Sequence, residues 1–338
     1  MDLIESYITW LEMNRGRAPR TAKKYRQALE RLVVYLAKEG KTLEQATREQ
    51  LEAFTGLHAH KELKLRPRAR RPLVAAVRGF YAWAASHGHV ESNPAAAVDY
   101  PKAGRVLPRA MTLVSAEQLL MQCDLSEFRG VRDAAILSIL IGCGPRISGV
   151  LSLNQEDLIW YAVEDRERLA IRFREKGDKE RLVPAPIETA LMIHAYLGHQ
   201  ELDGIDRSLE SGDRVLFVST RNRTVPPHEY NGEVRRLKAR AFFQQLRKYG
   251  EKAGIPAEQL HPHAMRHLFG TELAEHDIDL LIRQDLLGHE DPKTTQIYTT
   301  LAMRKKSAAI DAANPLRKMN IPVSELARQL ERSARRAP

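Results

Sequence analysis

HPHAMRHLFGTELAEHDIDLLIRQDLLGHEDPKTTQIYTT, residues 261–300, is the stretch that decides how this chain is interpreted. Pro262 suits the first position of a helix, where its missing N–H would have had no partner. His263 and Arg266 lie three residues apart and would therefore share one face of that helix. Both side chains can donate N–H groups to the same anion, so the pair suits a phosphate-handling site.

The second half of the stretch adds a histidine and a tyrosine. A short helix over residues 280–287 is predicted to end at Gly288, a natural C-cap, and His289 follows at once. Asp291-Pro292 predicts a further helix start, and Tyr298 lies about two turns beyond it. Each residue alone has an ordinary surface or packing role, so it is their combination that suggests a site.

More cations precede this stretch. The apolar segment 131–141 predicts a buried helix, and the following glycines and proline would end it and hold Arg146 beside the core. Two strands, 169–173 and 181–184, are predicted to form a hairpin whose turn carries Lys176 and Lys179. Either lysine alone would be an ordinary solvated turn residue.

These residue types suit an attack of tyrosine on a phosphodiester. Tyr298 is the obvious nucleophile, and bidentate contacts from Arg146 and Arg266 would stabilise the charge that develops on the phosphoryl oxygens. Lys176 would protonate a departing 5′-oxygen, and His263 would help to deprotonate the phenol, whose pKa is ordinarily about 10. The second histidine would donate to a phosphoryl oxygen, and with so many fixed cations we expect no metal and no other cofactor. The expected catalytic set is Arg146, Lys176, His263, Arg266, His289 and Tyr298.

Composition and motifs exclude several other classes of protein. With two cysteines there is no disulfide framework, so we expect a reducing cytosol. The N-terminus lacks the charged region of a signal peptide, and the longest apolar run, 134–143, is too short to span a bilayer, so we expect no membrane role. There is no P-loop and no dinucleotide fingerprint. His261, His263 and His267 are an alternative metal set, but no cysteine or suitably placed carboxylate completes it.

The net charge of +10 is unevenly distributed along the chain. Residues 1–105 hold 19 basic and 11 acidic residues, residues 106–302 hold 25 and 29, and residues 303–338 hold 9 and 3. Both ends are positive, which fits a polyanion contacted by an N-terminal module and a basic tail. A solvated basic surface is the alternative.

The N-terminal region predicts four to five short helices, including 21–39, 48–55 and 72–87. The run KELKLRPRARRP, residues 61–72, is predicted to be a loop whose cations anchor the module on phosphates without reading sequence; a merely soluble loop is the alternative. Further cations start the second helix and a helix predicted over 233–249. The candidate DNA-binding residues are Arg20, Lys23, Lys24, Lys61, Lys64, Arg66, Arg68, Arg70, Arg71, Lys179, Arg235 and Arg236.

The expected fold class is mainly α with a small β-sheet. Asn93-Pro94 and the run PKAGRVLP, residues 101–108, mark a domain boundary. We therefore expect a helical domain over 1–100, a linker over 101–112, a second domain over 113–302 and a tail over 303–338. In the tail, Ser324 would cap a helix with Leu326 and Leu330 four residues apart. This stripe is so narrow that the helix needs another surface, of the same chain or of a neighbour.

The motif set resembles the tyrosine recombinases of the phage-integrase class, and especially their Xer-like members. Order and spacing agree over about residues 1–305. RTAKKYRQALERLVVYL and the NPA of residues 93–95 resemble the core-binding domain of that family. The motifs of the catalytic domain are GPRISGVLSL with Arg146, REKGDKERLVP with Lys176, HPHAMRHLFGTEL with His263 and Arg266, and LLGHEDPKTTQIYT with His289 and Tyr298.

The resemblance implies a helical core-binding domain and a mixed α/β catalytic domain that form a C-shaped clamp on double-stranded DNA. It implies a 3′-phosphotyrosyl intermediate at Tyr298 and a free 5′-hydroxyl, without ATP or metal. Four protomers would synapse two sites with inverted-repeat core sequences and exchange strands through a Holliday junction. Residues after about Ala302 would pass a helix to the neighbouring protomer. The implied location is cytoplasmic and nucleoid-associated, in a bacterium or on a phage or other mobile element.

Gly149 departs from the family pattern, because many members carry an acidic residue there that supports the active site. The tail is also longer than in a minimal Xer-like member. The expected function is site-specific DNA recombination. The alternatives are a non-cleaving DNA-binding protein that regulates or organises DNA, and a monomeric relaxing topoisomerase. The target sequence, any need for accessory proteins, and the choice among integration, resolution, inversion and dimer resolution cannot be read from the residues.

Overall fold

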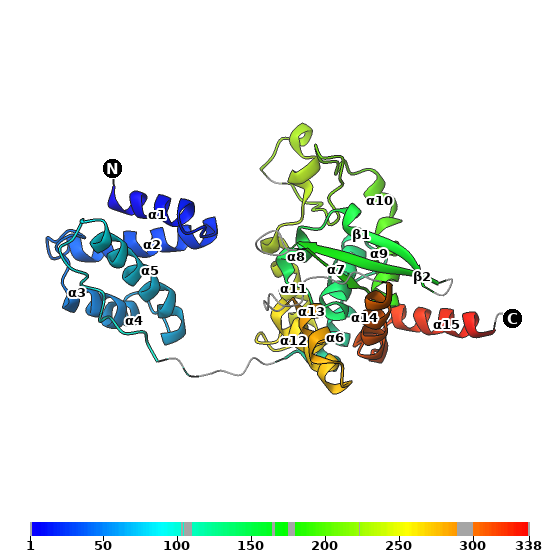
Figure 1. Cartoon of the computed structure of the whole chain (residues 1–338). Coiled ribbons are helices and arrows are strands. Elements are labelled where there is room, and N and C mark those ends of the chain that lie inside the picture. Colours follow the sequence, from blue (N-terminus) through cyan, green and yellow to red (C-terminus); the bar gives the residue numbers. More distant parts are fainter. Residues whose placement is uncertain are drawn as a thin grey trace. The chain divides into compact units, whose positions relative to one another are not determined.

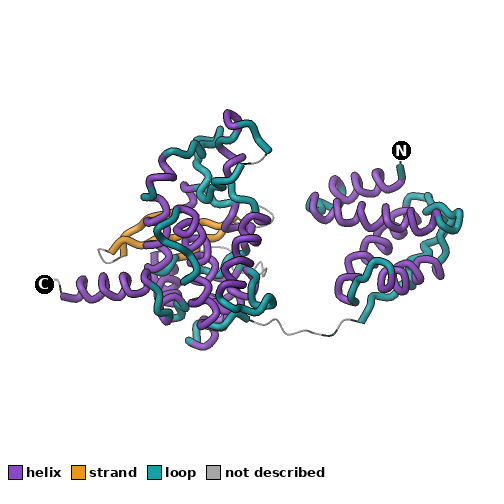
Figure 2. The backbone as a smooth tube through the Cα atoms, turned by 180° about the vertical axis from the view of Figure 1, so that it is seen from behind, coloured by secondary structure: helices purple, strands orange, loops and turns teal. Residues whose placement is uncertain are grey.

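The computed structural model of the chain describes residues 2–102, 104, 110–163, 166–174, 180–222, 224–288 and 300–336. Contacts divide the chain into two compact units, Met1–Leu107 and Pro108–Pro338, and each has its own hydrophobic core. The first unit is helical, and the second combines helices with a three-stranded sheet (Figures 1 and 2). The fold class is therefore mainly α with a small β-sheet, as expected.

Helices of the first unit pack around aromatic side chains. Tyr7, Phe54, Phe80 and Tyr81 are almost fully buried, and the Tyr81 hydroxyl donates to the Leu43 carbonyl at 2.8 Å. The elements are α1 (Leu3–Met13), α2 (Pro19–Ala37), α3 (Arg48–Ala53), the π-helical turn η1 (Phe54–His58), α4 (Ala59–Lys61) and α5 (Pro67–Ser86).

The basic run is more helical than predicted. α5 begins at Pro67, five residues before the predicted start, because proline at the first helical position loses no hydrogen bond. Pro72 lies inside this helix, where the burial of Leu73, Val74 and the residues that follow outweighs the one bond it removes. The third predicted helix likewise continues through η1 and α4 to Lys61. The predicted loop is thus confined to the few residues between α4 and α5.

The second unit contains the sheet and most of the helices. Within the described ranges, none of the helices is sufficiently long and apolar to cross a membrane. The elements are α6 (Leu113–Leu120), α7 (Phe128–Gly142), α8 (Ile147–Leu151), η2 (Gln155–Asp157), β1 (Leu158–Val163), β2 (Arg166–Arg174), β3 (Glu180–Pro184), α9 (Ile187–Leu197), α10 (Gln200–Asp203), η3 (Pro227–Glu229), η4 (Gly232–Arg235), α11 (Ala239–Lys252), α12 (Pro262–Glu275), α13 (Leu280–Leu287), α14 (Thr300–Ala312), η6 (Leu316–Lys318) and α15 (Pro322–Arg336).

The sheet has the antiparallel order β1-β2-β3. The predicted hairpin is present as β2 and β3, but β1 was not predicted. The buried segment Val215–Val218 forms isolated bridges from Val215 to Asn154 and from Val218 to Arg236. A short apolar run indicates burial, whereas strand pairing depends on a neighbour that local sequence does not reveal.

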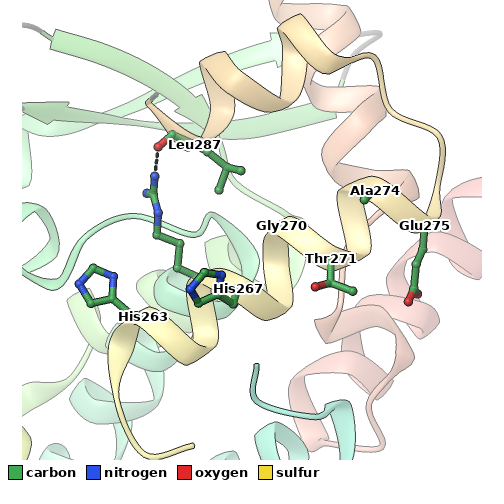
Figure 3. Close-up of a pocket in the computed structure, with 8 residues that line it drawn as sticks. His263, His267, Gly270, Thr271, Ala274, Glu275 and Leu287 are labelled. Atoms are coloured by element: carbon green, nitrogen blue, oxygen red, sulfur yellow. Dashed lines mark hydrogen bonds between the residues drawn. The ribbon is translucent and has the colours of Figure 1, made fainter. Parts of the chain in front are cut away.

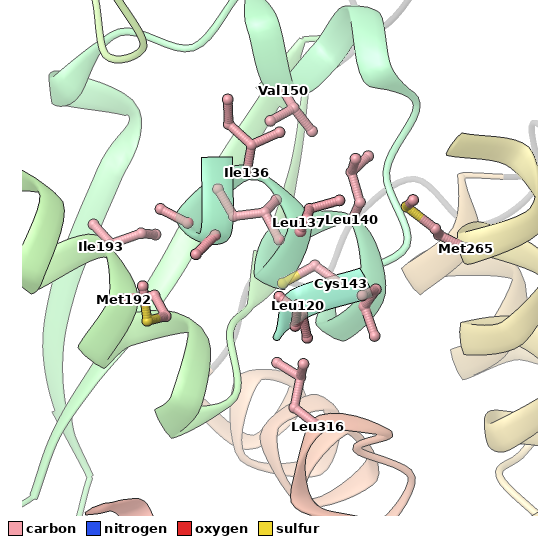
Figure 4. Close-up of a cluster of buried hydrophobic side chains, with 14 of the residues drawn as sticks. Leu120, Ile136, Leu137, Leu140, Cys143, Val150, Met192, Ile193, Met265 and Leu316 are labelled. Carbon is pink, nitrogen blue, oxygen red and sulfur yellow. The ribbon is translucent and has the colours of Figure 1, made fainter. Parts of the chain in front are cut away.

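α7 forms the centre of the second core, as its apolar sequence predicted (Figure 4). Ile136, Leu137 and Leu140 are fully buried. Met265 reaches this core from α12, and Leu316 reaches it from η6 near the end of the chain. The helix with the histidine–arginine pair and the C-terminal tail are therefore anchored on the same central helix.

The C-terminal tail packs on its own chain up to the first turns of α15. Asn314 Nδ2 donates to the buried Glu188 carboxylate at 2.7 Å, and Arg168 on β2 makes two bonds of 2.9 Å to Asp311 on α14. α15 contacts α9 and then extends out from the second unit (Figures 1 and 2). Its Leu326 and Leu330 stay 46% and 44% exposed. Much of the tail expected to pack on a neighbour thus has its partners in the same chain.

Candidate active site

α12 carries the central pair of candidate residues. Pro262 occupies its first position, and the Nδ1 atom of the N-cap His261 accepts the Ala264 N–H at 3.0 Å. Met265 and Phe269 are fully buried and fix the inner face of the helix, whereas His263 is exposed on the first turn. The helix thus begins where the sequence predicted, because the signals for its start are local.

Arg266 connects two segments that are distant in sequence. Its Nη1 donates to the Gly144 carbonyl at 2.7 Å, and its Nη2 donates to the Leu287 carbonyl at the end of α13 (Figure 3). Gly144 lies two residues before Arg146. This single guanidinium therefore holds together the loop that leads to Arg146 and the helix end that leads to His289.

Gly144 has no acceptable substitute at this junction. Its φ is +61°, a conformation that residues with a side chain rarely adopt. A Cβ atom added there would lie 2.3 Å from Cδ1 of Phe269 on α12. The loop and α12 can approach each other this closely only because the residue is glycine.

Arg146 is the exposed N-cap residue of α8. Its extended backbone, with φ −75° and ψ 143°, marks the point at which the loop turns into the helix. The positive charge of Arg146 is among the charges that act on His263. Arg146, His263 and Arg266 are therefore brought into one electrostatic neighbourhood by α8, α12 and the loop between α7 and α8.

The environment of His263 lowers the pKa of its imidazole from the ordinary value of 6.5. Partial burial is the main cause, and the electrostatic influence of the neighbouring His261, Arg266, His267 and Arg146 adds to it. A histidine with a lowered pKa is neutral at neutral pH and can accept a proton. This protonation state is the one that the expected role in deprotonating a phenol requires.

Arg181 is a buried residue that sequence reasoning did not single out. Its Nη1 donates to the Leu286 carbonyl, and its guanidinium lies 5.5 Å from the centre of the Phe173 ring. Arg181 and Arg266 thus occupy neighbouring carbonyls at the end of α13, where Gly288 adopts the left-handed C-cap conformation that its sequence position predicted. A basic residue inside an otherwise apolar strand was the available signal.

α12 also borders a pocket of about 490 Å³ (Figure 3). His263 and Arg266 line one end of it, and Thr271, Glu275 and Leu287 contribute to the remainder. Among the described residues, no three His, Cys, Asp or Glu side chains are grouped as metal ligands. Four candidate site residues, Lys176, Lys179, His289 and Tyr298, lie outside the described residues.

The candidate DNA-binding residues have different environments. Arg70 is half-buried, and its Nη1 donates to the Gly56 carbonyl at 3.0 Å. The Arg235 guanidinium lies 3.9 Å from the centre of the Tyr230 ring. The residues of the first unit with exposed side chains are Arg20, Lys23, Lys24, Lys61, Lys64, Arg66, Arg68 and Arg71.

Arg236 requires a correction. Its guanidinium faces inward and donates to the Leu153 carbonyl at 2.8 Å and to Asn154 Oδ1 at 2.7 Å, with a further ion pair to Glu233. The predicted helix over 233–249 is interrupted after η4, and α11 begins only at Ala239. Arg236 is thus a structural residue of this junction, because its donors are already used within the chain.

Comparison with known proteins identifies the family. The chain matches the model of the phage integrase family over residues 109–305 and that of the phage integrase N-terminal SAM-like domain over residues 4–88. Tyrosine recombinase XerC of Chromobacterium violaceum is 32% identical over 301 residues, which cover 89% of this chain and 90% of that protein. Tyrosine recombinase XerC of Shigella flexneri serotype 5b is 30% identical over 313 residues, covering 92% and 96%.

Solved structures share the fold. XerH site-specific recombinase bound to palindromic difH substrate, in a post-cleavage complex, aligns with a TM-score of 0.63 and 19% identity, covering 90% of this chain and 83% of that chain. A lambda integrase tetramer bound to a Holliday junction aligns with a TM-score of 0.60 and 16% identity, covering 88% and 79%. The two family matches and the XerC relatives show that the chain belongs to the phage integrase family and is a tyrosine-type site-specific DNA recombinase.

Proposed function

We propose that this recombinase cuts duplex DNA with Tyr298 and holds the cut strand as a 3′-phosphotyrosyl intermediate. The observation that carries the proposal is the position of Arg266. Its guanidinium binds the loop before Arg146 and the end of α13 before His289, beside a His263 whose pKa is lowered. These contacts of Arg266 with two of the segments that would build the site support the proposal.

The proposed step balances its atoms without a co-reactant. The Tyr298 oxygen bonds to phosphorus as the bond from phosphorus to the 5′-oxygen breaks. His263 takes the phenolic proton, and Lys176 gives a proton to the departing 5′-oxygen. Arg146, Arg266 and His289 donate to the phosphoryl oxygens as their negative charge grows. A tyrosine ester replaces a DNA ester, so neither ATP nor a metal is needed.

We further propose that the protein acts on paired sites as a tetramer. The lambda integrase structure that shares this fold is a tetramer on a Holliday junction, which supports such an assembly. Inverted-repeat core sites would place two protomers on each duplex by two-fold symmetry. Leu326 and Leu330, half-exposed on α15, are the residues that we propose contact a neighbouring protomer.

Exposed cations of the first unit are proposed to bind the DNA backbone. Lys61, Lys64, Arg66 and Arg68 lie within eight residues around the start of α5, and all four side chains are exposed. Such clustering favours contact with successive phosphates and gives affinity without reading bases. Arg20, Lys23 and Lys24 at the start of α2 are proposed to add to this contact.

A covalent trapping experiment tests the nucleophile. The target site is first selected from degenerate duplexes by binding and located by footprinting. The full-length protein is then incubated with a nicked duplex of that site, from which the short 5′-hydroxyl strand diffuses away after cleavage. The wild type should form a protein–DNA adduct that withstands denaturant, and Tyr298→Phe should bind the site without forming it. An adduct of unchanged yield in Tyr298→Phe would refute the assignment. A site-specific but non-cleaving DNA-binding protein would form no adduct at all.

A further inference from the structure

A second guanidinium binds the helix end that holds Arg266. Arg181 is 8% exposed and lies on β3 directly opposite Phe173 of β2. Its Nη1 donates to the Leu286 carbonyl, and the Nη2 of Arg266 donates to the next carbonyl, that of Leu287. Carbonyls in the last turn of a helix have no partner within the helix and carry the negative end of its dipole. Both cations are therefore favoured at this end of α13.

Arg181 also lies near the other attachment of Arg266. The Nη1 of Arg266 donates to the Gly144 carbonyl at 2.7 Å. Burial raises the pKa of the adjacent Cys143 thiol to about 12, and the charge of Arg181 is near enough to act on that thiol in the opposite direction. Arg181 is itself held in place by the Phe173 ring, whose centre lies 5.5 Å from the guanidinium. One buried cation is thus close to both segments whose carbonyls bind Arg266.

We infer that Arg181 is a positioning residue for Arg266 in strand cleavage. The Leu286 and Leu287 carbonyls flank the Cα atom of Leu287, so a donor that fixes the first limits where the second can lie. The second carbonyl in turn holds one side of the Arg266 guanidinium. A guanidinium stabilises developing charge only with its donors about 3 Å from the phosphoryl oxygen, so a small displacement slows the reaction. This inference rests on the proposed function of Arg266 as a phosphate ligand.

A neutral scissile linkage separates this role from a structural one. A methylphosphonate has a methyl group in place of one of the two non-bridging oxygens, and each of its two diastereomers lacks a different oxygen. An arginine that stabilises charge on one oxygen becomes dispensable when that oxygen is replaced. Single-turnover release of the 5′-hydroxyl strand by the full-length protein is measured on the phosphate duplex and on each diastereomer.

The variants remove either arginine or both. They are Arg266→Ala, Arg181→Met, Arg181→Lys and the double variant Arg181→Met/Arg266→Ala. Arg236→Met is the matched control, because the Arg236 guanidinium also donates to a backbone carbonyl, that of Leu153 at 2.8 Å, rather than to the end of α13.

On the phosphate duplex, Arg266→Ala should lose about 10²–10³-fold and Arg181→Met about tenfold. Arg181→Lys, which keeps the charge and a donor, should lose less than Arg181→Met. The diastereomer that relieves Arg266→Ala should also bring Arg181→Met to within about threefold of the wild type on the same duplex, and the other diastereomer should not. The double variant should be no slower than Arg266→Ala alone, because the two residues act as one unit. Any loss in Arg236→Met should be equal on all three duplexes.

Two results would overturn the inference alone. One is an undiminished rate of Arg181→Met on the phosphate duplex, and the other is a diastereomer that relieves Arg266→Ala but not Arg181→Met. If neither diastereomer relieves Arg266→Ala, the proposed role of Arg266 fails, and the inference fails with it. An unfolded fraction lowers the rates of one variant equally on all duplexes, so it leaves their ratios unchanged. If Arg181→Met does not fold, Arg181→Lys supplies the same ratios.

Discussion

His263 shows how the surroundings of a proposed catalytic residue set its protonation state. Its pKa is lowered by partial burial and by the cationic residues around it. The imidazole is therefore neutral in the folded protein at neutral pH, beside guanidinium groups that stay charged. The same cations that would bind a phosphate thus also keep the candidate base unprotonated.

The lowered pKa predicts the acidic limb of the pH–rate profile. Since the folded pKa lies below the ordinary 6.5, the acidic limb of the cleavage rate should be centred below pH 6.5. The contribution of His263 to the free energy of unfolding changes in the same direction with pH. It is complete above pH 6.5 and is lost as pH falls through the pKa of the folded protein. The measurement is single-turnover cleavage across pH 5–8.

His267→Asn is the control for this prediction. It removes one of the charges that lower the pKa of His263, so the acidic limb should remain and move toward 6.5. His263→Asn should be slow at every pH and lack the limb. A wild-type limb centred above 6.5 would be incompatible with the environment of His263 in this structure.

Gly144→Ala should destabilise the second unit. The positive φ costs about 1 kcal/mol for a residue with a Cβ. The 2.3 Å approach to Phe269 adds an overpacking cost of about 1–3 kcal/mol. The free energy of unfolding from urea titration measures the sum. Gly212→Ala is the control: φ there is +87° but nothing lies within 4 Å of an added Cβ, so only the backbone cost should appear. Equal losses in the two variants would show that the Phe269 contact is unimportant.

At the scale of elements, α13 precedes the segment that contains Tyr298 and α14 follows it, and both helices are bound to other parts of the second unit. Arg181 and Arg266 bind the carbonyl end of α13. Lys306 on α14 pairs with Asp285 on α13, and Asp311 pairs with Arg168 on the sheet. The elements before and after the proposed nucleophile are therefore both fastened to the same unit.

Truncation distinguishes the buried part of the tail from its projecting part. Removing residues 331–338 should leave the melting temperature nearly unchanged, because Ala327 is the last buried residue of α15 among those whose burial the structure describes. Removing residues 314–338 takes Leu316, Met319 and Ile321 out of the core, and each contributes about 1.5–3 kcal/mol. That sum is comparable to a typical total stability of about 5–15 kcal/mol, so the second unit should not fold cooperatively.

Calorimetry of both truncated chains provides the measurement. The unfolding of the first unit is the internal control, because Val98 is the last residue that the structure describes in its core. If the second unit still unfolds cooperatively after the longer truncation, the contacts of the tail within its own chain contribute little to stability. Packing of the whole tail on a neighbouring protomer would then be the better explanation.

At the scale of the whole molecule, the two units contain different groups of candidate residues. The first has an aromatic core and a cluster of exposed cations, whereas the second contains Arg146, His263 and Arg266 around α12. The division agrees with the charge distribution, since residues 1–105 are basic and residues 106–302 are slightly acidic. DNA affinity should therefore depend strongly on the first unit.

The salt dependence of DNA binding measures this contribution. Arg68 is exposed on the first turn of α5, so Arg68→Gln should lower the slope of log affinity against log salt by about 0.9, the value for one phosphate contact. Arg70→Gln removes the same charge two residues away, but its guanidinium donates to the Gly56 carbonyl, so the slope should hardly change. An identical slope change in both variants would show that net charge matters and individual contacts do not.

Local rules explain what could be predicted. Pro262 starts α12 and Gly288 ends α13 where expected, because caps and prolines act within one helical turn. The mainly helical fold with one small sheet and the buried α7 follow from the spacing of apolar residues in the same way. The family resemblance added the expected order of the catalytic motifs, and the family itself is confirmed by the matches.

Long-range contacts account for what could not be predicted. Arg236 and Arg181 looked like surface or strand residues, yet their guanidinium groups bind carbonyls far away in sequence. β1 and the inward face of the tail likewise depend on partners that no local pattern specifies. The sequence by itself thus determined the start of α12, the end of α13, the buried α7 and the family of this recombinase, because the signals for these lie within a few residues of one another. Only the tertiary structure decided which cations are held inside the protein and which remain at its surface. The N–H donors of a guanidinium are used by carbonyls and carboxylates that are distant in sequence and that only folding brings close to it.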